Sequence, residues 1–237
     1  MKKLLLVCAL MTLAPPMSVS AQERPGQQEV VVTAQRRQGV EPKAIPVVGM
    51  LRIADFAVQP VIVAGDTRDP IRRHDEIYAT IKQAIELAKR SGSIELASGA
   101  VVVEPLTLEN YRNLTLKDDD RPDSERAAFL IKTRLANGAD SKAALDRITA
   151  FIKSVPTVGR AELKTDGDLT LSVVRPDQYR SAIIDLVASD AKTTASRLGP
   201  DYAVDIKGLD RPVDWARASL TEVYLFLPYS FEVVPKR

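Results

Sequence analysis

The stretch DPIRRHDEIYATIKQAIELAKRSG, residues 69–92, predicts a long helix and sets the fold class. Asp69 is a typical N-cap, Pro70 suits the first helical position, and Gly92 is a typical helix end. Between them, one stripe of side chains recurs at spacings of three and four residues. Its members are Ile71, His74, Ile77, Tyr78, Ile81, Ile85 and Ala88. A helix with one such stripe must pack against another element.

Runs rich in β-branched residues lie on both sides of this helix and predict strands. The expected strands are 47–53, 57–64, 94–103, 127–135, 161–165, 168–174, 202–207 and 222–234. Pro60 interrupts the second of them, which favours a sheet edge or a bulge. Asp166-Gly167 separates two of the runs and is a strong signal for a β-hairpin.

Two further helices are expected. The first starts at Asp140 and closes at Pro156, with Leu145, Ile148, Ile152 and Val155 on one face. The other starts at Pro176 or Asp177 and stops at Gly199-Pro200. Its inner face would carry Tyr179, Ile183, Leu186, Val187, Ala191, Thr194 and Leu198. The order of elements predicts an α+β fold, with a mainly antiparallel sheet and three helices packed on it.

The first 21 residues have the pattern of a secretory signal peptide. Lys2 and Lys3 precede the apolar run Leu4–Leu13, and Val19-Ser20-Ala21 is a small-residue cleavage site. We therefore expect three parts, namely a signal peptide at 1–21, a flexible segment at 22–46 and one domain at 47–237. The mature chain would lie in the periplasm, in association with the outer membrane.

The mature chain offers little material for catalysis. Cys8 is the only cysteine and leaves with the signal peptide, and His74 is the only histidine. Nucleophile–base pairs and zinc sites of the usual kinds are therefore nearly excluded. No phosphate-binding glycine loop occurs. We predict no enzyme activity, no cofactor and no metal site, although an unrecognised carboxylate pair would remain compatible with the sequence.

The charge of the mature chain is balanced. Removal of Lys2 and Lys3 reduces the 33 basic residues to the number of the acidic ones, which is 31. A neutral chain has no general attraction for nucleic acid, so we expect no nucleic-acid partner.

The segment EVVVTAQRR, residues 29–37, is a short β-prone run between turn-forming residues. It resembles the TonB box that opens many TonB-dependent outer-membrane receptors, although no receptor barrel follows it here. The resemblance implies that Glu29, Val30, Val31, Val32, Thr33 and Ala34 pair as an added strand with the periplasmic domain of TonB. The alternatives are a strand that docks on the protein's own sheet, and a chance match.

The domain at 47–237 resembles the SIMPL-domain family of bacterial envelope proteins. The resemblance rests on Ala54–Gly65, on Ser93–Pro105 and on RPDQYRSAIIDLVASDAKTTASRLG at Arg175–Gly199, which contains an Asp-Ala-Lys step at Asp190–Lys192. It implies a periplasmic or outer-membrane-associated α+β protein, often linked to envelope or oxidative stress and to oligomers. The family supplies no established catalytic residues.

The segment 222–234 would be apolar on both faces, with Val223, Leu225 and Leu227 on one side. On the other side Tyr224 and Phe226 are candidates for a partner or oligomer face, unless a loop or a second layer covers them.

Together these patterns predict a non-enzymatic periplasmic adaptor accessory to TonB-dependent transport, with TonB and an outer-membrane receptor as partners. The alternative is an oligomeric SIMPL-type stress protein in which the N-terminal strand is structural.

Overall fold

The computed structural model describes residues 29–32, 45–99, 103–135 and 141–236. Its elements are β1 (Glu29–Val32), β2 (Met50–Ile53), β3 (Phe56–Gly65), α1 (Pro70–Ser91), β4 (Glu95–Ser98), β5 (Glu104–Pro105), β6 (Lys117–Asp118), β7 (Glu125–Arg134), α2 (Ser141–Ser154), β8 (Glu162–Thr165), β9 (Thr170–Val174), α3 (Arg180–Leu198), β10 (Tyr202–Lys207), β11 (Asp214–Arg217), β12 (Glu222–Phe226) and β13 (Ser230–Pro235). The predicted α+β class is confirmed.

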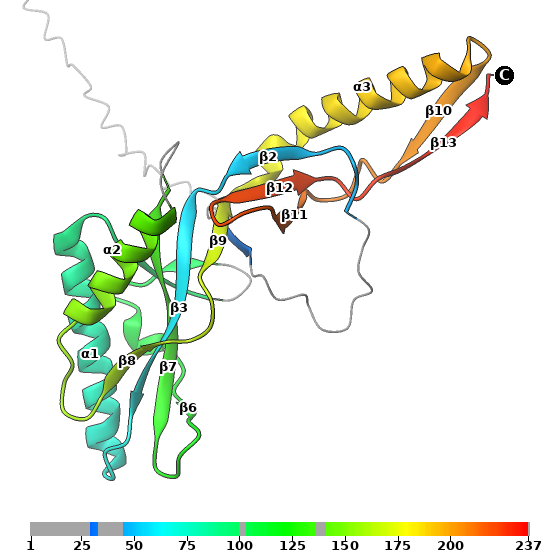
Figure 1. Cartoon of the computed structure of the whole chain (residues 1–237). Coiled ribbons are helices and arrows are strands. Elements are labelled where there is room, and N and C mark those ends of the chain that lie inside the picture. The colour runs from blue at the N-terminus through cyan, green and yellow to red at the C-terminus, as the bar shows by residue number, and fades with distance from the viewer. Residues whose placement is uncertain (1–28, 33–44, 100–102, 136–140, 237) are drawn as a thin grey trace, which may run out of the picture.

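An antiparallel pair of long strands, β3 and β7, forms the centre of the main sheet (Figure 1). Phe56 pairs with Arg134 at one end and Gly65 with Glu125 at the other. Short strands flank this pair, giving the order β1-β9-β3-β7-β4-β5, with β6 on β7 and β8 on β3. Every strand pair is antiparallel, as the sequence predicted.

The two helices α1 and α2 cover one face of this sheet. Ile77 and Ile81 on α1 and Ile148 on α2 are almost fully buried with Val61 and Ile131 of the central strands. The predicted ends of α1 are confirmed, because Asp69 accepts a hydrogen bond from the Arg72 N–H at 2.9 Å and Gly92 has a φ of 64°. On α2, the predicted core residue Leu145 is exposed, and Ala144 and Phe151 are buried in its region.

The third helix does not share that face, which corrects the prediction of three helices on one sheet. Helix α3 contacts β10, which pairs with β13 in a separate two-stranded sheet. Figure 1 shows α3, β10 and β13 extending away from the main sheet. Helix α3 buries Ile183, Val187 and Ala191, whereas Leu186 and Leu198, both expected on its inner face, are exposed.

The predicted hairpin at Asp166-Gly167 is wrong. Strands β8 and β9 do not pair with each other, but lie end to end along the same edge of β3. The residues between them bulge opposite Pro60, where the Asp166 N–H donates to the Pro60 carbonyl at 2.9 Å. Gly167 has a φ of 92°, which suits such a turn. The bulge expected at Pro60 therefore lies in the neighbouring segment between β8 and β9, opposite a proline that has no N–H to donate.

Two predicted strands are also divided. The run 94–103 contains β4, which ends at Ser98 and pairs with β5 in the opposite direction. The run 222–234 contains β12 and all of β13 except its last residue, and these two strands belong to different sheets. Pro228 lies between β12 and β13, and proline cannot supply a ladder hydrogen bond.

A buried carboxylate on α1 fixes the connection into β8. Glu76 is 6% exposed and accepts hydrogen bonds from the Thr67 hydroxyl at 2.5 Å and from the Arg160 backbone N–H at 3.0 Å. The neighbouring Gly159 has a φ of 60°, and an added Cβ would lie 2.1 Å from Glu76 Cδ. The hydrogen bond from Thr67, followed by that from Arg160, lowers the pKa of Glu76.

This lowered pKa predicts an acid-sensitive contribution to stability. Ionised Glu76 stabilises the fold above the ordinary pKa of 4.5, and the stabilisation is lost as the pH falls through the lower pKa of the folded state. We expect Glu76→Gln to destabilise the protein at neutral pH by about 1–3 kcal/mol, and to lose less stability than wild type between about pH 6 and pH 3. Urea unfolding across this range measures both quantities.

The matched control is Glu86→Gln on the same helix, where the carboxylate pairs with Lys82 at 3.9 Å and is only half-buried. This variant should keep the pH dependence of wild type. An unchanged pH dependence in Glu76→Gln would contradict the assignment.

Candidate functional site

The N-terminal strand is docked on the protein's own sheet. Strand β1 pairs antiparallel with β9, with Glu29 opposite Val174 and Val32 opposite Leu171. The docked alternative is therefore what the structure shows for residues 29–32, in place of a free segment acting away from the domain. Thr33 and Ala34 lie outside the described residues.

A buried ion pair joins β1 to the centre of the sheet. The Glu29 carboxylate, on a residue 9% exposed, accepts from the Lys132 ammonium through Oε2 and from the Ser172 hydroxyl through Oε1, the latter at 2.6 Å. Lys132 is 4% exposed and Ser172 is fully buried. Each carboxylate oxygen thus has its own buried donor, an arrangement that offsets part of the cost of burying the charges.

An aromatic ring completes the surroundings of this cation. Lys132 Nζ lies 4.1 Å from the centroid of the Phe56 ring, and Arg134 Cζ lies 4.8 Å from the same centroid. Both cations come from β7, and strand alternation places them on the face opposite Ile131. Arg134 is largely exposed and bonds to Glu95 at 3.0 Å, whereas Lys132 depends on Glu29.

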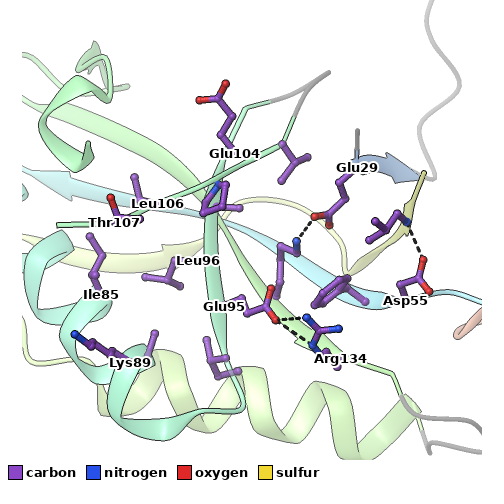
Figure 2. Close-up of a pocket in the computed structure, with 18 of the residues that line it drawn as sticks. Glu29, Asp55, Ile85, Lys89, Glu95, Leu96, Glu104, Leu106, Thr107 and Arg134 are labelled. Atoms are coloured by element: carbon purple, nitrogen blue, oxygen red, sulfur yellow. Dashed lines mark hydrogen bonds and ion pairs between the residues drawn. The ribbon is translucent and has the colours of Figure 1, made fainter. Parts of the chain in front are cut away.

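The ion pair lies in the wall of a cleft of about 1170 Å³. Figure 2 shows Glu29 pointing from its strand into this region, and the pair formed by Glu95 and Arg134 beside it. The apolar part of the lining comes from Phe56, Ile85, Leu96, Val103 and Leu106. A cleft with apolar walls and a few placed charges has the composition of a binding site.

Sequence reasoning selected Glu29 but missed Lys132 and Ser172. A signal for Lys132 was present, because a lysine inside the apolar run AAFLIKTRL, residues 127–135, must either face solvent or find a buried partner. No local pattern named that partner, since Glu29 is 103 positions away in the sequence.

The structure places the two candidates for a partner face in unequal surroundings. Phe226 is 4% exposed and is therefore covered by its own chain. Tyr224 is half-buried, and its hydroxyl donates to the Val47 carbonyl at 2.8 Å. Burial raises the pKa of Tyr224. Phe226 is covered by another part of the chain, which was the alternative to a partner face, and little of its ring is left for a partner.

The single histidine belongs to a charged cluster at the start of α1. His74 Nε2 lies 2.8 Å from a Glu125 oxygen that also bonds to Arg73 at 2.6 Å. Burial acts to raise the pKa of Glu125, but the hydrogen bond from Arg73 and the charge of His74 outweigh it and lower the pKa. Among the described residues, no group of three or more His, Cys, Asp or Glu could hold a metal ion.

Comparisons with known proteins assign no family, because neither a protein-family profile nor a curated protein matches the chain. Within the part of the chain that the structure describes, none of the helices has the length and apolar character needed to cross a membrane.

The ion pair predicts a specific effect on the docking of β1. Lys132→Met would leave the Glu29 carboxylate buried without its cation, a state that costs about 3–5 kcal/mol. We expect β1 to leave β9 instead, so that hydrogen exchange of the Val30–Val32 amides accelerates by about tenfold or more.

The control is Arg134→Met, which removes a cation from the same strand and from the same aromatic ring. The Arg134 side chain is 75% exposed, so exchange in β1 should stay near the wild-type rate. Equal acceleration in both variants would show that the ion pair does not hold the strand.

Proposed function

We propose that the protein is a non-enzymatic binding protein of the bacterial periplasm that pairs through β1 with the C-terminal domain of TonB, as an accessory to TonB-dependent outer-membrane transport. The observation that carries this proposal is the place of β1 in the sheet. β1 is the terminal strand, paired with β9 on one side and with no described strand on the other.

An edge strand of this kind suits β-augmentation. On its second side the described residues place no hydrogen-bonded strand, so a strand from another protein can add there. The resemblance of residues 29–37 to the TonB box and the signal-peptide pattern of residues 1–21 support TonB as the partner and the periplasm as the compartment. β1 can therefore remain docked on β9 while it receives the TonB strand on its open side.

Proline substitution tests which side of β1 is used. In an antiparallel strand the N–H groups of successive residues point to opposite sides, so one of Val30 and Val31 directs its N–H to the open edge. We expect proline at that position to abolish capture by the periplasmic domain of TonB and to leave thermal stability near wild type. Proline at the other position should weaken docking on β9.

The matched controls are Val30→Ala and Val31→Ala, which keep the N–H groups and should still be captured. Pull-down and thermal unfolding of the four variants give the two measurements. Capture of both proline variants at wild-type levels, or no capture of wild type, would reject the proposal.

A second candidate function is an oligomeric SIMPL-type envelope-stress protein in which β1 is structural. The docking of β1 and the buried Glu29–Lys132 pair favour a structural strand. Exposed apolar side chains occur toward both ends of the β10–β13 pair, with Leu198 and Tyr202 at one end and Phe231 toward the other, and they provide surface for subunit contact.

Sedimentation of the mature chain and of a chain starting at Val47 tests this second candidate. We expect an oligomer for the mature chain. This candidate assigns β1 to the subunit contact, so truncation, which also removes the counter-charge of Lys132, should abolish the oligomer. A monomer in both samples would exclude this candidate.

A further inference from the structure

We propose that the edge of β9, together with Lys132 and Ser172, is a receptor groove for an extended peptide from another chain that carries a glutamate followed by β-branched residues. In the described structure, the chain's own β1 occupies this groove. The inference does not depend on TonB, because it concerns the side of β1 that faces β9.

The groove carries a buried positive charge. Lys132 comes from the central strand β7, is almost fully buried and lies against Phe56. The neighbouring carboxylate of Glu95 is already bonded to Arg134. A buried ammonium without a counter-charge is strongly unfavourable, so the domain needs a carboxylate at the position of Glu29.

The groove binds both oxygens of one carboxylate. Lys132 and Ser172 donate to different oxygens of the same carboxylate, and they come from different strands of the sheet. Asparagine and glutamine cannot reproduce this set of contacts with equal strength, because a charged acceptor strengthens both hydrogen bonds. The groove therefore selects an acidic side chain at one position.

Apart from the ion pair, β1 is held by backbone pairing with β9. Among the described residues, its register with β9 runs from Glu29 to Val32, and this pairing uses backbone groups that every extended peptide has. The described contacts of β1 are therefore backbone pairing and one ion pair, both of which an equivalent strand can supply. The chain's own β1 competes because its tether gives it a high effective concentration, so binding in trans requires its release.

Charge reversal supplies two full-length variants with a vacant groove. In Glu29→Lys, docking of the chain's own strand would place a lysine against Lys132. In Lys132→Glu, it would place Glu29 against a glutamate. Both contacts join like charges and are repulsive. Fluorescence anisotropy then measures binding of a labelled peptide with the sequence of residues 27–34, QQEVVVTA, and of the same peptide with Glu29→Lys.

We expect the Glu29→Lys chain to bind the native peptide at least about tenfold more tightly than the lysine peptide, and the Lys132→Glu chain to show the opposite preference. Such a reversal cannot come from misfolding, because each variant would bind one of the two peptides. Equal affinity for both peptides would show that backbone pairing alone explains docking. Equal affinity, or binding of neither peptide by either variant, would overturn the proposal.

Discussion

The structure depends on the long antiparallel pairing of β3 with β7. These two strands carry the residues that α1 and α2 cover on one face, and Lys132 and Phe56 on the other. Each outer edge accepts two short strands, which are β8 and β9 on β3, and β4 and β6 on β7. Because α1 and α2 already bury one face of the β3–β7 pair, its second face can carry functional side chains while the hydrophobic core stays intact.

The buried ion pair links this scaffold to the N-terminus. A carboxylate and an ammonium in a dry environment are tolerated only with good geometry and further hydrogen bonds, and Ser172 supplies one such bond. The pair adds specificity to the docking of β1, because a shift of one residue along β9 would turn the Glu29 side chain to the opposite face. The proposed functions use the two sides of the same strand. TonB would add to its open edge, and the groove on β9 would accept an equivalent strand in its place.

Local sequence signals predicted the helices well, since caps and periodic stripes act over a few residues. Asp69, Gly92 and the stripe from Ile77 to Ala88 behave as expected, whereas Ile71, the first member of the predicted stripe, is 76% exposed. Strand signals were weaker guides, because they do not specify partners. Asp166-Gly167 has the chemistry of a hairpin turn, yet β3 offers an edge to the strand on each side of it, and the chain bulges there instead. For the site, the sequence singled out Glu29 as part of a recognition segment, but not as half of a buried ion pair.

The sequence by itself determined the α+β class, the bounds of α1, the scarcity of cysteine and histidine, and the β-prone character of residues 29–32, because these follow from residue type and short-range spacing. Only the tertiary structure decided where β1 docks, that Lys132 is its counter-charge, and that α3 lies on β10 away from the main sheet. The physical reason is the distance along the chain. Contacts between residues separated by a hundred positions are selected by shape and charge complementarity after the sheet has formed, and no local pattern records them.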